Sequence, residues 1–268
     1  MPKVRLRRAL VALLALIAIY GIAAEIGRGC LPDRIWMGSH YVENVQLLPT
    51  FGALAEEGTF LLESRILAES IVASSRRVLI GVLLGAVIGI LLGLGTGWAA
   101  RFAYLADPWV TLFRFTPALA LLPLYVAWFG YGETSKVLLI ATGVAVVALL
   151  GAHQGVRGVP RAYLDAAASL GAGKRLVFRR IVLPLALPAI LASLRIAIAL
   201  AWVTIVVAEL IDAKMPSLGY LLALSGAYPR MPQMLIALAT LAALVLVFDF
   251  AVLLLHARAT RWMKRTSS

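Results

Sequence analysis

The chain has 268 residues, of which 62% are hydrophobic and 14% charged, whereas a soluble domain carries about 25% charged residues. This composition excludes an ordinary soluble domain and predicts a polytopic membrane protein. The formal net charge of +12 does not indicate nucleic-acid binding, because the basic residues lie in loops between apolar runs, where the positive-inside rule places them. One cysteine, Cys30, excludes an internal disulfide, and the histidines (His40, His153, His256) lack metal-ligand spacing.

The first element is an apolar run from Ala9 to Ala24, preceded by four basic residues. The run falls slightly short of the roughly 20 apolar residues that cross a bilayer. We expect an uncleaved first span with its N-terminus inside. A signal peptide cleaved near Ala24 is the alternative, since the same pattern marks secretory signals.

Residues 25–69 are the acidic part of the chain, with seven acidic and three basic residues. That balance places the segment on the outer side of the membrane. Leucine and isoleucine recur at helical spacing towards its end (Leu54, Leu61, Leu62, Ile66, Leu67). They predict a helix that lies along the membrane surface or leads into the next span.

The second span is predicted at about residues 78–100, and glycine recurs in it at every fourth position: Gly81, Gly85, Gly89, Gly93 and Gly97. Such a stripe forms a groove that lets another backbone approach closely. We expect it to serve packing within the chain rather than a dimer seam. Arg76 and Arg77 precede the span on its outer side, and we expect them to snorkel or to pair with acids such as Glu69.

The third and fourth spans are predicted at about residues 109–129 and 137–156. The third contains Pro117 and Pro123, which a bundle tolerates where other groups satisfy the backbone. It also contains Arg114, an ionisable residue at membrane depth.

A charged loop follows, between residues 157 and 184. Pro160 suits a first helical turn and Gly171 a left-handed stop. The alanines between them favour a short helix, which is marginal unless something docks on it. Basic residues crowd the loop against one acid, Asp165; they are Arg157, Arg161, Lys174, Arg175, Arg179 and Arg180.

The run Gly171 to Lys174 superficially matches a phosphate-binding loop. A P-loop needs glycine where Ala168 stands and serine or threonine where Arg175 stands. We therefore expect no nucleotide or other cofactor in this chain. The sequence also lacks a nucleophile elbow and paired catalytic carboxylates, so we expect no catalytic residues.

The fifth and sixth spans are predicted at about residues 185–207 and 234–256. Arg195 and Asp249 lie inside them, where charges are costly and face a cavity or a partner. Two interpretations stay open: Arg114 or Arg195 helps an anion to cross, or Arg195 pairs with Asp249. Glu209, near the outer end of the fifth span, is expected to make a gate or turn contact, because a carboxylate repels an anion.

The charged loop resembles the EAA motif of the permease subunits of binding-protein-dependent ABC importers. The spacing is kept throughout, with Asp165 in place of Glu; the matching residues are Asp165, Ala166, Ala167, Gly171, Ile181, Leu183 and Pro184. The resemblance implies a cytoplasmic coupling helix that sits in a groove of a separate ATPase subunit. A basic loop held to anionic lipid headgroups is the alternative, but it needs no fixed Ala-Ala-Gly spacing.

Three further segments resemble the nitrate, sulfonate and taurine branch of these permeases. They are Pro117–Lys136, which includes Trp128-Phe129-Gly130-Tyr131-Gly132-Glu133, then Ala208–Leu210, then Ser217–Tyr220. The family resemblance runs from about Leu67 to Leu255.

The fold we expect is an all-α membrane protein, with six transmembrane helices in the MetI-like bundle of type I ABC importer permeases. The N-terminus, the charged loop and the C-terminus are all basic, so both termini are expected in the cytoplasm. The expected organisation has three parts. They are an N-terminal span with the acidic segment (1–66), a permease core carrying the coupling loop (67–257), and a basic tail (258–268).

The resemblance implies a permease subunit for a small anion in a bacterial inner membrane, with taurine or an alkanesulfonate favoured. Its implied partners are an ATP-binding subunit that holds ATP and Mg²⁺, a solute-binding protein, a second copy of the chain, and the lipid bilayer. Nitrate, bicarbonate or a pyrimidine vitamin precursor are alternative cargoes. A membrane-embedded enzyme lacks a catalytic constellation here, and a secondary transporter would show internal repeats.

Overall fold

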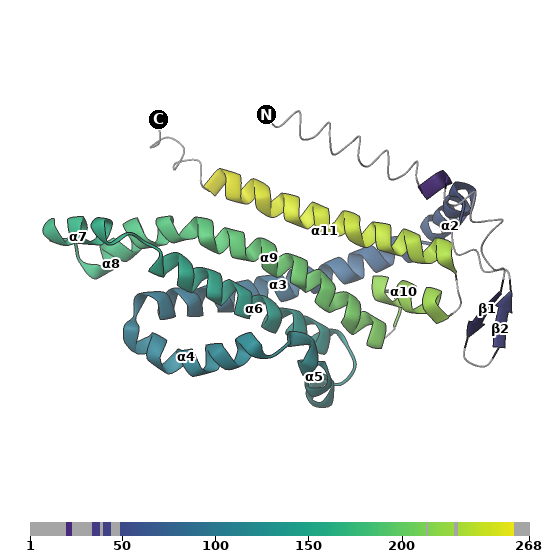
Figure 1. The fold of residues 1–268 in the computed structure, drawn as a ribbon, viewed down its shortest axis with the longest axis horizontal. Helices are drawn as coiled ribbons and strands as arrows, with labels where there is room; N and C mark the ends of the chain where they lie inside the picture. The colour runs from purple at the N-terminus through teal and green to yellow at the C-terminus, as the bar shows by residue number, and fades with distance from the viewer. Residues whose placement is uncertain are drawn as a thin grey trace. The chain divides into compact units, whose positions relative to one another are not determined.

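The computed structural model describes residues 20–22, 34–37, 40–43, 49–212, 214–227 and 230–259. Within these residues the chain is helical apart from one short hairpin (Figure 1). It forms two compact units, one of residues 1–71 and 215–241, the other of residues 72–214 and 242–268. The division falls inside two long helices, α3 (Ile66–Trp98) and α11 (Met231–Ala259).

The first unit contains the hairpin and two short helices. Strands β1 (Arg34–Met37) and β2 (His40–Glu43) pair antiparallel. Helix α2 (Phe51–Glu63) begins at Thr50, whose hydroxyl accepts the amide proton of Ala53 at 3.3 Å. Helix α10 (Leu218–Ala227) begins after Ser217, whose hydroxyl accepts from the Tyr220 amide at 3.0 Å. The helix expected near the end of the acidic segment is therefore present as α2.

The second unit is organised around helix α6 (Glu133–Arg157), which packs against α3 through the glycine stripe. A Cβ on Gly85, Gly89 or Gly93 would collide with α6 backbone atoms, namely the carbonyl oxygens of Ala141, Ala145 and Leu149. The two helices therefore touch backbone to backbone, which only glycine allows. The expectation that the stripe serves packing within the chain is confirmed.

Small residues also line the other face of α6, where α9 (Leu183–Ile211) packs along it. A Cβ on Gly151 would overlap the side chain of Ser193, and one on Gly155 would meet the carbonyl oxygen of Ala186 at 2.9 Å. Helix α6 is thus packed closely on two sides. Helices α3, α6 and α9 form a frame, and this frame carries the Arg77, Glu133 and Glu209 side chains.

The third predicted span is wrong as a continuous helix. Helix α4 (Ala100–Phe115) ends at Thr116, a 3₁₀ turn η1 (Ala118–Leu121) follows, and α5 (Leu122–Phe129) continues to Gly130. The break lies at Thr116, which is extended (φ −85°, ψ 117°). The ring of the next residue, Pro117, disfavours helical geometry in the residue before it, and Pro117 has no N–H to donate.

Four helices of the described chain are long and apolar enough to cross a membrane: α3, α6, the continuous segment Lys174–Ile211, and α11. They contain the second, fourth, fifth and sixth predicted spans. The first predicted span, Ala9 to Ala24, lies almost wholly outside the described residues.

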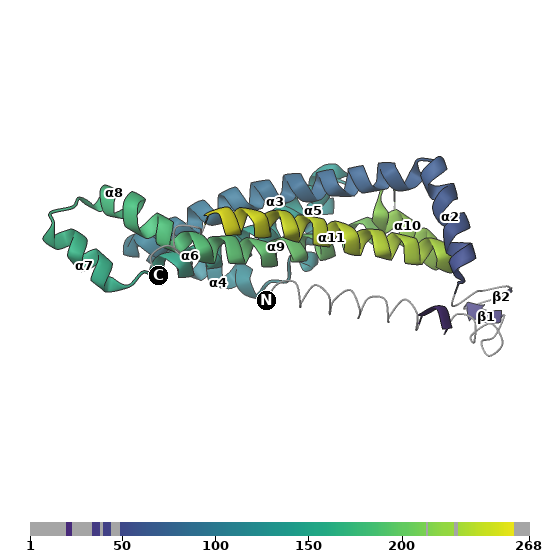
Figure 2. The same ribbon diagram turned by 90° about the horizontal axis from the view of Figure 1, so that it is seen from above.

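The charged loop folds into two short helices at one end of the α6–α9 pair. Helices α7 (Arg161–Ser169) and α8 (Lys174–Val177) lie beyond the ends of α6 and α9, as both ribbon views show (Figures 1 and 2). A five-residue π-helical turn, η2 (Phe178–Val182), joins α8 to α9. We call this end of the pair the loop end, and the end that carries Glu133 and Glu209 the opposite end.

Candidate functional site

Helix α7 is stopped by a Schellman motif. Gly171 has a left-handed backbone (φ +70°) and donates its N–H to the carbonyl of Ala168 at 2.9 Å. Ala172 donates to the carbonyl of Ala167 at 3.0 Å. This pair of bonds satisfies the last carbonyls of the helix, and the left-handed residue is cheapest as glycine. The stop expected at Gly171 is therefore confirmed, and the helix begins at Arg161, directly after Pro160.

Helix α7 packs on its own chain through Ala167 and is otherwise largely exposed. Ala167 is buried in an apolar cluster with Val177 of α8 and Val182 of the π-helical turn. Tyr163 is 54% exposed, and Leu170, which follows the helix, is 87% exposed. Asp165 is also exposed. Tyr163 and Leu170 are thus large side chains that stay exposed in and directly after a short helix.

The two halves of the EAA-like motif meet in space. Ala167, from its first half, is in the same cluster as Val182, which lies between Ile181 and Leu183 of its second half. Ile181 packs against that cluster, and Leu183 and Pro184 begin α9. Packed side chains therefore connect α7 to the start of a long membrane helix.

Arg195 and Asp249 form a two-point ion pair. The Arg195 Nε donates to Asp249 Oδ1 at 2.7 Å, and Nη2 donates to Oδ2 at 2.7 Å. This forked geometry is the strong form of the interaction. The two side chains are 39% and 37% exposed. Arg114 belongs to α4, and its side chain lies outside the part of the chain that the structure describes.

A buried charge network lies at the opposite end. The sequence predicts that Arg76 and Arg77 snorkel or pair with acids, but it does not predict which acids. Arg77 of α3 is 5% exposed and reaches Glu209 of α9, which is fully buried, with Nη1 to Oε1 at 2.7 Å. Its Nε donates to Glu133 of α6 at 2.9 Å. Ser74 also donates to Glu209 at 2.9 Å. One guanidinium thus joins three helices.

The acids that meet the two arginines are Glu133 and Glu209, which the sequence did not pair with them; Arg76 also reaches Glu133, at 3.4 Å. The expectation that Glu209 makes a gate or turn contact is compatible with its position, since it lies two residues before the end of α9. A signal was present in the sequence: Glu133 directly follows Gly132 at the start of an apolar run, where a lone acid needs a partner.

A second ion pair lies at the same end of the α6–α9 pair. Lys136 of α6 meets Asp212, directly after α9, at 3.0 Å, and both side chains are largely buried. The spacing from Glu133 to Lys136 equals the spacing from Glu209 to Asp212. Glu133 and Lys136 share a face of α6, and both take part in ion pairs that fasten the opposite end of the α6–α9 pair.

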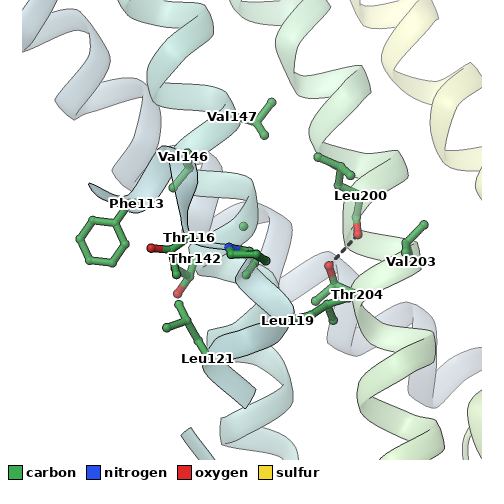
Figure 3. Close-up of a pocket in the computed structure, with 13 residues that line it drawn as sticks. Phe113, Thr116, Leu119, Leu121, Thr142, Val146, Val147, Leu200, Val203 and Thr204 are labelled. Carbon is green, nitrogen blue, oxygen red and sulfur yellow. Dashed lines mark hydrogen bonds between the residues drawn. The ribbon is translucent and has the colours of Figure 1, made fainter. Parts of the chain in front are cut away.

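A cavity of about 260 Å³ lies where the break after α4 faces α6 and α9 (Figure 3). Apolar side chains such as Phe113, Leu119 and Val203 form most of its wall. Its polar side chains are Thr116, Thr142 and Thr204. None of the lining residues that the structure describes is charged. Irregular backbone at membrane depth is tolerated where it lines a cavity, and the break at Thr116 satisfies this condition.

No group of three or more His, Cys, Asp or Glu residues could hold a metal ion within the described chain. Ion pairs join its helices through Arg77, Lys136 and Arg195. The arrangement therefore has the elements of a helical frame with an uncovered docking helix, and the class that such a frame defines is a membrane transport subunit.

Comparison with known proteins identifies the family. Residues 70–265 match the family described as the binding-protein-dependent transport system inner membrane component. The chain therefore belongs to this family of ABC transporter permeases, which are transport subunits and not enzymes, with ATP hydrolysed by a separate ATPase. It is a multi-pass membrane protein.

Two curated relatives place the chain more closely. A probable ABC transporter permease protein of Brucella abortus is 33% identical over 243 residues, which cover 90% of this chain and 97% of the relative. The taurine transport system permease protein TauC of Escherichia coli is 35% identical over 194 residues, covering 72% of this chain and 70% of the relative. The resemblance to the sulfonate and taurine branch is confirmed.

A solved structure supports the fold. The chain resembles a MetNI methionine ABC transporter subunit in an inward-facing conformation, with a TM-score of 0.64 and 19% identity. The match covers 73% of this chain and 96% of that one. At this identity the likeness establishes the MetI-like arrangement of helices and nothing about the cargo.

Proposed function

We propose that this chain is the permease subunit of an ATP-driven importer for a small anion, with taurine or an alkanesulfonate as the cargo. The observation that carries the proposal is helix α7, which joins through Ala167 an apolar cluster that includes the start of α9 and leaves Tyr163 and Leu170 uncovered. In this position, a displacement of α7 by a partner protein can be transmitted to the membrane helices.

The uncovered face of α7 is proposed to sit in the ATPase subunit, in contact through Asp165, Ala166 and Gly171. The Ala166 side chain adds little bulk, which suits close approach to a groove, and Gly171 has open space around it. ATP and Mg²⁺ are held by that subunit, and this chain is proposed to bind neither.

The proposed topology has six passes, with both termini in the cytoplasm of a bacterium whose inner membrane holds the protein. The first pass is Ala9 to Ala24, and the third is the broken segment α4–η1–α5. The basic loop end is then cytoplasmic, in line with the positive-inside rule. A second copy of the chain is proposed to complete the pathway, and a solute-binding protein to deliver the cargo to the other side.

The cargo proposal rests on the branch to which the chain belongs, of which a member named for taurine is 35% identical. Nitrate, bicarbonate and a pyrimidine vitamin precursor remain alternative cargoes for the same machine. The Arg195–Asp249 pair is proposed to be a structural link between α9 and α11, because both donors of the guanidinium fork that face Asp249 are already used.

The test is a complex of this chain with its ATPase and solute-binding protein, reconstituted in vesicles, in which taurine uptake and ATP hydrolysis are measured together. We expect Gly171→Leu to abolish uptake while ATP hydrolysis continues, because leucine strains the left-handed turn and adds bulk at the ATPase contact. Gly173→Leu is the matched control for bulk, since Gly173 has an ordinary extended backbone (φ −65°) and equally open surroundings.

Coupled taurine uptake in the unsubstituted complex supports the function, and its absence with every cargo named above would overturn it. If Gly171→Leu assembles with the ATPase and drives uptake at the original rate, α7 is not the coupling element.

A further inference from the structure

The cavity beside the break at Thr116 differs from a site for an anion in the hydrogen-bonding groups that it presents. Its three polar side chains are threonines from three different elements, the end of α4, the middle of α6 and α9. Figure 3 shows Thr116 and Thr142 on one wall and Thr204 on the wall formed by α9. Thr204 is 7% exposed, so its hydroxyl group is shielded from solvent.

Each of these hydroxyl groups donates its proton to its own helix. Thr116 donates to the Leu112 carbonyl at 2.9 Å, Thr142 to that of Leu138 at 2.9 Å, and Thr204 to that of Leu200 at 2.8 Å. A threonine hydroxyl has one proton and two lone pairs. With the proton used by the backbone, what each side chain offers to the cavity is an acceptor.

Tyr125 strengthens this polarity. Its hydroxyl group lies within hydrogen-bond distance of the Thr142 hydroxyl. Because the Thr142 proton is donated to Leu138, Tyr125 is the donor in this contact. Its proton is therefore also used, and it does not supply a donor to the cavity.

The size of the cavity limits what it can hold. A volume of about 260 Å³ is several times the roughly 30 Å³ that one water molecule occupies in the liquid. A solute of a few to about ten non-hydrogen atoms fits. Gly143 helps to keep this space open, because a Cβ there would approach the Cβ of Ala118 at 3.3 Å.

We infer that this cavity is a passage site that selects cargo carrying a hydrogen-bond donor, and in particular the ammonium group of an aminoalkanesulfonate. This inference rests on the proposed function and narrows it. An ammonium group has three donors and no acceptor, so it complements the threonine oxygens. An alkanesulfonate without an amino group has no donor for these threonine oxygens, so it gains none of these contacts.

The same reasoning separates this cavity from the Arg195–Asp249 pair. Neither residue lines the cavity, and Arg195 directs two of its donors to Asp249. The sulfonate end of the cargo is therefore not held by Arg195 in this site. Weak holding suits a passage site, because the cargo must leave it again in each cycle.

The test compares two cargoes of the same shape, taurine and propane-1-sulfonate, in which a methyl group replaces the ammonium. The reconstituted complex is supplied with saturating solute-binding protein and cargo, so that the maximal rate of uptake reports the permease. In Thr116→Val/Thr204→Val, valine keeps the shape and removes two acceptors. We expect maximal taurine uptake to fall about tenfold, while propane-1-sulfonate uptake is unchanged or rises.

Two further variants isolate the hydroxyl groups. Thr204→Ser keeps the acceptor, and we expect it to retain taurine uptake. Thr240→Val is the matched control, because Thr240 of α11 donates to its own helix in the same way, at 2.7 Å to Ile236, and does not line the cavity. The single variants Thr116→Val and Thr204→Val, each expected to lose about threefold, serve if the double variant does not assemble.

An equal loss for both cargoes, or no loss for taurine, overturns the inference and leaves the proposed function standing. If the unsubstituted complex moves only propane-1-sulfonate, the importer stands and the donor requirement is wrong. If it moves neither cargo, the proposed sulfonate function fails together with the inference.

Discussion

The two ends of the α6–α9 pair are held together by different forces. At the loop end, α7 packs through Ala167 against an apolar cluster and closes its backbone with the turn at Gly171. At the opposite end, Arg77 joins Glu133 and Glu209 across three helices. The loop end relies on many small contacts, whereas the opposite end depends on a few buried charges that are stabilising only while all of them are paired.

This difference suits the two ends to different tasks. Apolar packing around a small residue allows α7 to shift by small steps, and its outer face remains available to a partner. A buried charge cannot shift without losing its partner in a low-dielectric environment, so the opposite end behaves as a fixed point. Under the proposed function, a displacement of α7 by the ATPase subunit would turn α9 about its fastened end.

The largest effect is expected from Glu209→Leu. The change leaves the Arg77 guanidinium buried with one acid instead of two, and removing one member of a buried pair costs about 3–5 kcal/mol. Unfolding of the purified chain in detergent, followed by helix content against denaturant, measures the loss. Arg77→Leu/Glu209→Leu is the control, and it should recover most of the stability because Glu133 is half exposed and keeps Arg76. A double variant as unstable as the single one contradicts the network.

Lys136→Met should cost less, about 2 kcal/mol. The Asp212 carboxylate that loses Lys136 still has Lys214 within 3.5 Å. The same detergent unfolding measures it. Lys214→Met is the matched control, because Lys214 is mostly exposed and an exposed ion pair contributes less than about 1 kcal/mol. Equal losses for the two lysine variants would show that burial does not set the strength of this end.

The loop end could be predicted from the sequence because its signals are local. Pro160, Gly171 and the alanines between them stand within a dozen residues, and backbone conformation at each depends on its neighbours. The glycine stripe could also be predicted, since a glycine at every fourth position of an apolar helix forms a groove for close helix packing.

The opposite end could not be predicted in the same way. Arg77 and Glu209 are 132 residues apart, and no local pattern pairs them. The sequence permits two interpretations of Arg195, an ion pair with Asp249 or a role in anion passage, because both charges stand alone in apolar spans. The break at Thr116 was missed although Pro117 was visible, since a proline in a membrane helix bends it in some bundles and ends it in others.

Gly171→Ala sharpens the comparison at the loop end, with an expected loss of about 1 kcal/mol. Alanine has no steric obstacle at this position, because nothing lies near a Cβ there, and the cost comes only from the left-handed backbone. Gly173→Ala is the control, and we expect it to be neutral or slightly stabilising. Unfolding in detergent distinguishes them, and equal stability of the two variants would mean that the turn is not strained.

The smallest effect on stability, and a large one on function, is expected from Asp165→Lys. Asp165 is exposed. Its backbone carbonyl accepts a hydrogen bond from the Ser169 hydroxyl at 3.0 Å. A lysine keeps that carbonyl, so the free energy of unfolding should change by less than about 0.5 kcal/mol.

Under the proposed function, the same change reverses the charge that α7 would present to the ATPase subunit, in a loop that is otherwise basic. Like charges brought together at an interface cost binding energy and misplace the partner, so uptake should fall while the chain stays folded. Uptake and ATP hydrolysis in vesicles, together with unfolding in detergent, measure both quantities on the same preparation. Asp165→Asn, which removes the charge without reversing it, should lose less. If Asp165→Lys unfolds the chain instead, α7 is part of the frame and the two ends of the pair do not differ in kind.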